Sequence, residues 1–232
     1  MRLSVLLVGA AVAASVAGIA SADPLNVVYN GTTGNLGKNI TVSLSGGLFF
    51  QNGASSGTVW AGQYSHNIDG VDYKTFCTEL TQFAGSGLFN TIALADAPRP
   101  GSGMGQVKAD AIYRLFNATN KGLAIDTNAK AAAFQATIWE IVYEYDGTES
   151  ALNLDLGNVT FSSGINAGLF SLYSSFATAQ GGDSTARVIA ITNDTNQDQI
   201  LSVPLPGAAA MAGLGLLGLT TRRRRQDPVC SE

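Results

Sequence analysis

The sequence is poor in the residues that build metal sites and disulfide frameworks. Among its 232 residues there are two cysteines and one histidine, too few for a structural zinc site with the usual four ligands. Two cysteines in a chain of this length also cannot form the framework of a cystine-rich module. We therefore expect no metal site and no cofactor.

Charge is also sparse and unevenly placed. Charged residues make up 13% of the chain, with 13 basic and 17 acidic residues and a formal net charge of −4. Residues 23–202 hold eight basic and fifteen acidic residues, a formal charge of −7. Because affinity for nucleic acid comes from clustered Lys and Arg, this balance argues against a nucleic-acid partner.

The first 22 residues have the pattern of a secretory signal peptide. Arg2 is followed by an almost wholly apolar stretch over residues 3–20, and then by a small-residue pattern that ends at Ala22. This order predicts cleavage between Ala22 and Asp23. The alternative is an uncleaved N-terminal membrane helix, but the polar chain that starts at Asp23 favours cleavage.

Residues 203–232 combine a proline motif, an apolar run and a block of arginines. The apolar run over residues 205–221 has 17 residues, close to the lower limit for a membrane span of about 20. Arginines after such a span stay on the cytoplasmic side, so the segment would hold an exported body outside the membrane. The motif and the block are Val203, Pro204, Leu205, Pro206 and Arg222, Arg223, Arg224, Arg225.

This tail resembles the PEP-CTERM class of sorting signals, in particular its VPLPA-type variant. The resemblance implies recognition by an exosortase-like membrane transpeptidase, which cuts near the proline motif and releases or re-anchors the body. The tail departs from the variant in having Gly207 in place of Ala and seven residues after the arginines. A plain single-span membrane anchor is the alternative.

The segment between these ends, residues 23–202, is expected to form one globular body. Its first part, residues 23–100, has short apolar runs separated by turn-forming dipeptides such as Asn30-Gly31 and Asp69-Gly70, which predicts a sandwich or barrel. The expected strands are Asn26–Tyr29, Ile40–Leu44, Leu48–Gln51, Thr58–Tyr64, Tyr73–Leu80 and Phe89–Ala93.

The next part, residues 101–182, has helical periodicity, and residues 183–202 are expected to form a late β-hairpin. The fold class is therefore α+β, with a β-rich N-terminal half, a helical subdomain and a hairpin, plus an N-terminal signal helix and a C-terminal transmembrane helix. The expected elements are a helix from Met104 with Val107, Ala111, Ile112, Leu115 and Phe116 on one face, a helix capped by Asn128 that runs to about Glu144, a helix over Ser163–Ala179 with the stripe Ile165, Leu169, Leu172 and Phe176, and strands Thr185–Thr192 and Gln199–Val203.

Two strings in the body carry candidate chemistry. Cys77 ends a predicted strand, and Gln135 lies on a predicted helix four residues before Trp139. Residues four apart share a helix face, so Gln135 is expected to point toward the core. A buried carboxamide needs a partner, and a cysteine thiolate is one unusual choice. It can attack the carboxamide carbon, expel ammonia and leave an internal thioester, if both groups are held in contact away from water.

Here the body resembles the thioester domains of bacterial surface adhesins. Phe76-Cys77 matches their aromatic-Cys dipeptide, and residues 135–139 match a Gln-containing segment that opens a helix. The resemblance implies that Cys77 supplies the sulfur and Gln135 the acyl group. It departs from the family at Phe134, where Thr is usual, and at Thr137, where Ala is usual. The expected pocket residues are Phe76, Glu79, Phe134, Ile138 and Trp139.

Each candidate has a plainer alternative. Cys77 can be a small buried hydrophobe and Gln135 a border residue of its helix, although a secreted cysteine without a partner needs an explanation, because Cys230 lies in the tail. His66 can serve as a base for Cys77 in a thiol protease, but it falls in a predicted turn and is expected to be solvated. Glu79 can accept a proton or can hold a salt bridge or rim position.

Two acidic clusters are weaker candidates. Glu140 and Glu144 can form a carboxylate pair, but a solvated helix face is the expectation. Asp194, Asn196 and Asp198 alternate in a loop and can hold a cation weakly, but they lack the Gly and the distant Glu of a calcium loop. A polar turn is therefore expected there.

The sequence therefore predicts an exported protein of the cell-envelope surface or extracellular matrix, made as a membrane-anchored precursor and sorted through its tail. Its expected action is adhesion by covalent attachment to an amine- or hydroxyl-bearing surface or polysaccharide, which is not enzymatic turnover. The alternative is a sorted structural or matrix protein without a thioester, which binds polysaccharide or protein partners non-covalently. A secreted hydrolase is the third possibility, but the sequence contains no convincing triad or carboxylate site for it.

Overall fold

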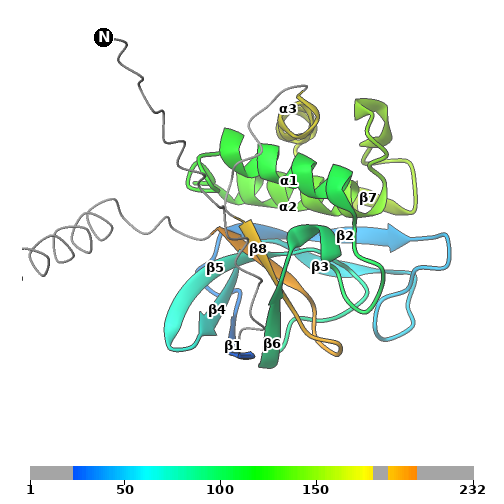
Figure 1. Cartoon of the computed structure of the whole chain (residues 1–232). Helices are drawn as coiled ribbons and strands as arrows, with labels where there is room; N and C mark the ends of the chain where they lie inside the picture. The colour runs from blue at the N-terminus through cyan, green and yellow to red at the C-terminus, as the bar shows by residue number, and fades with distance from the viewer. Residues whose placement is uncertain (1–22, 180–187, 203–232) are drawn as a thin grey trace, which may run out of the picture.

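The computed structural model describes residues 23–179 and 188–202 (Figure 1). The expected signal peptide, residues 1–22, and the expected sorting tail, residues 203–232, lie outside the described residues. Within the described ranges, no helix is both long and apolar enough to span a membrane. The strands are β1 Leu25–Gly31, β2 Gly37–Leu44, β3 Ser56–Gly62, β4 Tyr64–Ile68, β5 Val71–Cys77, β6 Gly87–Ile92, β7 Val159–Ser163, β8 Val188–Thr192 and β9 Gln199–Ser202, and the helices are α1 Gln106–Ala118, α2 Asn128–Tyr143 and α3 Ala167–Thr178, with short 3-10 turns at Leu94–Asp96 and Glu149–Ala151.

Six strands close into an antiparallel barrel in the order β1-β4-β5-β9-β8-β6. The late hairpin β8–β9 completes the barrel between β5 and β6, since Phe76 pairs with Ile200 and Asn90 pairs with Thr192. The predicted α+β class, the β-rich barrel and the hairpin are thus confirmed. A closed barrel has no free strand edge. Four of its strands, β1, β4, β5 and β6, lie early in the chain, and the barrel closes only when β8 and β9 fill the gap between β5 and β6.

The remaining strands form a small sheet in the order β3-β2-β7. Figure 1 shows the three helices together on one side of the molecule, with β2 and β3 between them and the barrel strands. Helix α2 packs on β2 and β3, and α3 packs on both α1 and α2. The buried side chains of these layers form one core, and α2 is central to it because residues 131–142 are all buried.

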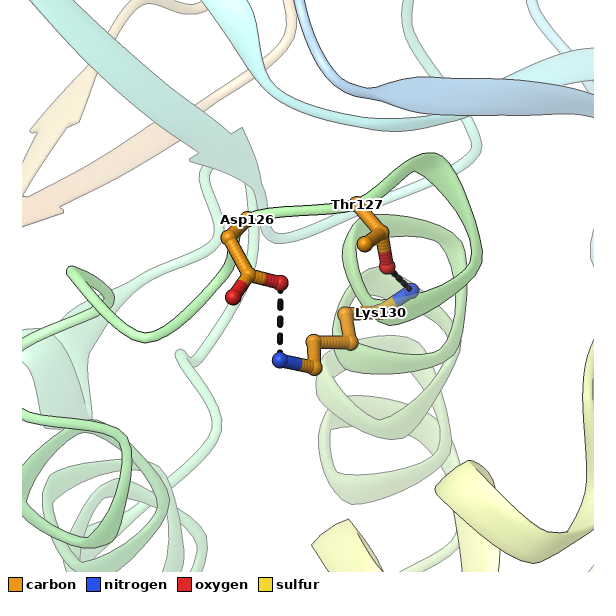
Figure 2. Close-up of polar contacts among 3 residues, drawn as sticks. All are labelled: Asp126, Thr127 and Lys130. Carbon is orange, nitrogen blue, oxygen red and sulfur yellow. Dashed lines mark hydrogen bonds and ion pairs between the residues drawn. The ribbon is translucent and has the colours of Figure 1, made fainter.

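The N-terminus of α2 differs by one residue from the expectation. The N-cap is Thr127, whose hydroxyl accepts a hydrogen bond from the Lys130 backbone N–H at 3.2 Å. Asn128 does not cap the helix because its Oδ1 accepts instead from the N–H of Gly37 on β2, at 3.3 Å. Figure 2 shows the cap together with the Asp126–Lys130 ion pair at 2.7 Å. Such a cap stabilises a helix by about 1 kcal/mol.

Three further expectations about local structure are wrong. Residues 48–51 lie in a loop instead of a strand, and the Phe50 N–H donates to the Ala54 carbonyl at 2.9 Å across the turn that follows. The segment before the third helix is strand β7, and α3 begins only after its cap Asn166. The buried face of α3 carries Phe170, Tyr173, Ser174, Ala177 and Thr178, whereas Leu172 of the predicted stripe is 45% exposed. Both stripes satisfy helical spacing, so only the packing against α1 and α2 selects between them.

The predicted face of the first helix is mostly confirmed. Ala111, Ile112, Leu115 and Phe116 of α1 are buried, but Val107 in its first turn is 56% exposed. The helix begins one turn before it reaches the rest of the core, so its first apolar residue remains at the surface.

Candidate functional site

The structure brings Cys77 and Gln135 together. The Cys77 backbone N–H donates to Gln135 Oε1 at 3.1 Å, and Gln135 Nε2 donates to the Cys77 carbonyl at 2.7 Å. The two residues are 58 positions apart in sequence, on β5 and α2, and both are 0% exposed. The Gln135 carboxamide is therefore held against the cysteine by two hydrogen bonds in a site without solvent contact.

The end of β5 explains why a glutamine fits there. One side of Cys77 faces β9, where it is aligned with Gln199. On the other side, β4 begins at Tyr64, which pairs with Thr75, so among the described strands none reaches Cys77. A primary carboxamide presents an N–H donor and a C=O acceptor on the same side, as a residue of a hydrogen-bonded strand pair does. Gln135 thus takes the place of the missing strand and satisfies both backbone groups, which is the partner that a buried glutamine needs.

The Cys77 side chain lies beside Tyr64 and Trp139, in the core that includes the helices. Burial raises the pKa of the Cys77 thiol well above its ordinary value, and the Tyr64 hydroxyl and the Trp139 indole N–H offset this only in part. The Tyr64 hydroxyl donates to the Trp60 carbonyl at 3.0 Å, while Trp139 Nε1 has no hydrogen-bond partner of acceptable geometry within the described chain. The thiol is therefore neutral and shielded, unlike the exposed thiolate of a cysteine protease.

The expected pocket residues divide between the two faces of β5. Successive strand residues point to opposite faces, so Phe76 points away from the barrel interior toward the helices. Its ring lies 4.7 Å from Phe134 and 6.2 Å from Phe116. Trp139 is the predicted residue that lies beside the sulfur, and Ile138 is fully buried in the helical core. The Phe76–Phe134 contact fixes α2 against β5, and this contact positions Gln135.

Glu79 does not occupy the rim position or the salt bridge that we expected. It is 3% exposed, and its carboxylate accepts hydrogen bonds from Thr81 Oγ1 at 2.6 Å and from the Asp198 backbone N–H at 3.2 Å. Across residues 23–179 and 188–202 the one ion pair is Asp126–Lys130. Burial raises the pKa of Glu79. Because β5 ends at Cys77, Glu79 lies in the following loop and joins it to the loop before β9.

His66 is not a solvated loop residue. It lies on β4 and is 0% exposed, with Nδ1 2.9 Å from Thr75 Oγ1. The hairpin turns instead at Asp69-Gly70, where φ is +47° and +87°. Burial lowers the pKa of His66 to about 4, so the ring is neutral. Thr75 in turn donates to Gln199 Oε1 at 3.0 Å, and this polar chain occupies the barrel interior.

Glu140 and Glu144 do not form a solvated helix face either. Glu140 is 0% exposed, and its Oε2 accepts from the Asn153 N–H at 3.0 Å, while Glu144 Oε1 accepts from the N–H groups of Asn158 and Val159 at 2.6 and 3.1 Å. Burial raises the pKa of Glu140 to about 8. The two carboxylates hold the loop that leads into β7 against α2.

The acidic loop before β9 is a polar turn built around a buried carboxylate. Asp198 is 0% exposed and accepts from the N–H groups of Arg99 and Asn193 at 2.5 and 3.0 Å, and burial raises its pKa to about 7. Asn193 also accepts from the N–H groups of Thr195 and Asn196. Within the described residues, no three His, Cys, Asp or Glu side chains are placed to hold a metal ion.

A pocket of about 300 Å³ lies beside Tyr64 and Trp139, and of its lining only Trp139 was among the predicted pocket residues. Its walls come from β1, β3, β4, α2 and four loops. Tyr64, His66 and Ile68 alternate on one strand and are buried, a period-two signal that identifies Tyr64 as an inward-facing residue. The rest of the lining follows from tertiary packing, which a single sequence does not encode locally.

Comparison with known proteins adds no relative. No protein-family model matches the chain, and neither a curated protein nor a solved structure matches it.

Proposed function

We propose that this protein is an exported cell-surface or extracellular-matrix protein that carries an internal Cys77–Gln135 thioester for covalent attachment to amines or hydroxyls. The observation that supports this most strongly is the pair of hydrogen bonds, at 3.1 and 2.7 Å, that holds the Gln135 carboxamide against Cys77. Both residues are fully buried, as a bond that water hydrolyses requires. The fold places them together from segments 58 residues apart.

Bond formation uses only groups already at the site. The Cys77 sulfur attacks the Gln135 carboxamide carbon, the C–N bond breaks, and the nitrogen leaves as ammonia with the thiol proton. The Cys77 N–H, which already donates to Gln135 Oε1 at 3.1 Å, stabilises the negative charge that develops on that oxygen, as an oxyanion hole does. Holding both groups in one dry site supplies the proximity that the reaction requires.

The product is a stored electrophile. An amine or hydroxyl attacks the acyl carbon, the C–S bond breaks, and the acceptor's proton returns to the Cys77 sulfur, leaving an amide or ester on Gln135. Because burial raises the pKa of this thiol, the thiolate is a poor leaving group until it receives that proton. Each molecule reacts once, so the role is attachment and not turnover.

The signal peptide and the PEP-CTERM-like tail complete the proposal. They imply export, recognition by an exosortase-like enzyme and a membrane-anchored precursor at the cell envelope, with residues 205–221 in the membrane before processing. The body's formal charge of −7 argues against nucleic acid as the target.

A second candidate function keeps the same location without the covalent bond. In the structure, the Gln135 carboxamide already satisfies the Cys77 N–H and carbonyl, so it can serve as a structural replacement for a strand. The protein would then bind polysaccharide or protein partners by surface loops alone.

Methylamine distinguishes the two candidates. If the thioester forms, incubating the purified protein with methylamine adds one methylamide at Gln135 and exposes one new thiol at Cys77, both located by peptide mapping in denaturant. Cys77→Ala is the matched control, because alanine keeps the backbone groups that bind Gln135, and it should take up no methylamine. Full alkylation of Cys77 before methylamine treatment, with Gln135 unmodified afterwards, would support the non-covalent candidate.

A further inference from the structure

The pocket of about 300 Å³ extends from the surface toward Cys77. At its inner end are Tyr64 and Trp139, both buried and both beside the Cys77 sulfur. At its outer end are Thr58 and Phe83, which are exposed. The volume is at the lower end of the range for small-molecule sites, about 300–1,000 Å³. The pocket is therefore the approach by which a small acceptor group can come near the proposed thioester.

The chemistry of the lining indicates a neutral ligand. None of the described residues that line the pocket is charged, and its polar groups belong to threonines, glutamines, tyrosines and tryptophans. Without an opposite charge in the pocket, a carboxylate, phosphate or ammonium would lose its hydration uncompensated. The lining instead offers six aromatic rings, whose faces suit the C–H faces of a sugar ring. These rings belong to Tyr29, Phe50, Trp60, Tyr64, Phe83 and Trp139.

Two buried polar atoms on lining residues are poorly satisfied. Gln82 Oε1 is buried without a hydrogen bond in the described chain, and Trp139 Nε1 has only the Cys77 sulfur, a weak acceptor, beside it. One atom is an acceptor and the other a donor, and a buried polar atom without a good partner costs free energy. A hydroxyl both accepts and donates, so a polyol can satisfy the two atoms. A protonated amine has no lone pair and cannot accept from the indole N–H.

Hydrogen bonds hold the loops at the mouth of the pocket together. The Phe83 N–H donates to Gln51 Oε1 at 3.0 Å, and its carbonyl accepts from the Gln197 N–H at 3.0 Å. Gln82 Nε2 donates to the Asp194 carbonyl at 2.9 Å, which leaves its Oε1 as the free acceptor. These bonds join three loops, so a ligand binds without first ordering them, and such preorganisation favours affinity.

We propose that this pocket binds a neutral sugar ring of a polysaccharide and delivers one of its hydroxyls to the Gln135 acyl group. The covalent step rests on the proposed thioester, whereas the binding step does not. In the covalent step the sugar oxygen attacks the acyl carbon, the C–S bond breaks, the hydroxyl proton passes to the Cys77 sulfur, and an ester forms. Cys77 and Gln135 do not line the pocket, so a shift of Tyr64 or Trp139 must accompany this step.

The binding step is measured on the Cys77→Ala chain, which cannot form a thioester. Both tryptophans of the sequence, Trp60 and Trp139, line the pocket, so intrinsic fluorescence reports occupancy directly. The probes are neutral hexose oligosaccharides, polygalacturonate fragments and spermidine. We expect a saturable fluorescence change with a neutral oligosaccharide only. Binding should weaken about tenfold in Gln82→Ala and in Phe83→Ala, which corresponds to about 1.4 kcal/mol for one lost contact.

Phe49→Ala is the matched control, because Phe49 is 54% exposed, like Phe83 at 50%, but does not line the pocket. Affinity should be unchanged in this variant. The proposal is overturned if no neutral oligosaccharide saturates the signal, if spermidine or polygalacturonate does so instead, or if Phe83→Ala behaves like Phe49→Ala. If Cys77→Ala binds sugar while the wild type forms no ester or methylamide, the pocket assignment stands and the thioester fails. The reverse pattern overturns the pocket alone.

Discussion

Replacing Gln135 by alanine in the Cys77→Ala background is expected to lower the free energy of unfolding by about 3–6 kcal/mol. The Cys77 substitution removes any cross-link, so the comparison isolates the carboxamide. Without Gln135, the backbone N–H of residue 77 loses its acceptor at 3.1 Å, and its carbonyl loses its donor at 2.7 Å. Both residues are 0% exposed, so water does not replace these partners. Each unpaired buried group costs about 1–3 kcal/mol, and the vacated volume adds a cavity penalty.

Urea denaturation of the single and double variants measures this difference. Gln135→Glu in the Cys77→Ala background is compared with Gln135→Ala, because a protonated carboxyl still offers one acceptor and one donor to residue 77. It should restore most of the lost stability at pH 4 and little at pH 8, where the carboxyl tends to ionise. A cost below about 1 kcal/mol for Gln135→Ala, near the usual effect of a surface substitution, would contradict the role of Gln135 as the replacement for a strand.

The second large effect is a loss of stability as the pH rises. Burial raises the pKa of Glu140 to about 8, above its ordinary value of about 4.3 in the unfolded chain. Between these values the folded state binds a proton that the unfolded state has lost. Stability from this group is therefore complete below about pH 4.3 and falls until about pH 8, by about 3–5 kcal/mol.

Three other buried titratable groups also affect how the free energy of unfolding depends on pH. The pKa of Asp198 is raised to about 7 and that of Glu79 is also raised, both by burial, so they add loss in the same direction. His66 acts oppositely, because burial lowers its pKa to about 4 and the unfolded chain binds its proton first below about pH 6.5. The gain from His66 offsets the loss from only one of these carboxyls, so stability is expected to fall with rising pH from about pH 4.3 upward.

Glu140→Gln should remove most of the loss between pH 5 and pH 8.5 in denaturant titrations, since an amide oxygen can still accept from the Asn153 N–H. Glu144→Gln makes the same change in charge one turn away, on a partly exposed residue, and should leave the slope nearly intact. A wild-type stability that rises from pH 5 to pH 8.5, or equal slopes in both variants, would contradict the assignment.

The elements that the sequence predicts well are those with local signals. Turn dipeptides and alternating runs indicated most of the barrel strands, and helical spacing located α1 and α2. The buried state of Glu140 carries no such signal, because residues 131–142 of α2 are buried on every side and a helix covered all round has no polar face to reveal. Thr127 caps α2 only because Asn128 is bound to Gly37, a contact 91 residues away in sequence.

The candidate site also combines features that local sequence patterns predict with features that only long-range packing determines. The helical spacing of Gln135 and Trp139 correctly indicated a buried glutamine, and Cys77 lies at the end of a strand, as predicted. The reason for the juxtaposition is that β4 begins only at Tyr64, opposite Thr75, which leaves Cys77 without a neighbour on one side. That is a property of barrel register, and neither it nor the position of Tyr64 beside the sulfur can be derived from spacing along one segment.

The intact mass of freshly purified protein tests the thioester most directly. Formation of the Cys77–Gln135 bond releases one ammonia, so we expect a mass lower than that of the processed sequence by one ammonia. Cys77→Ala and Gln135→Glu should each have the full mass of their own sequence. Methylamine should raise only the wild-type mass. A wild-type protein that has the full sequence mass, with Cys77 reacting as a free thiol on unfolding, would contradict the central claim.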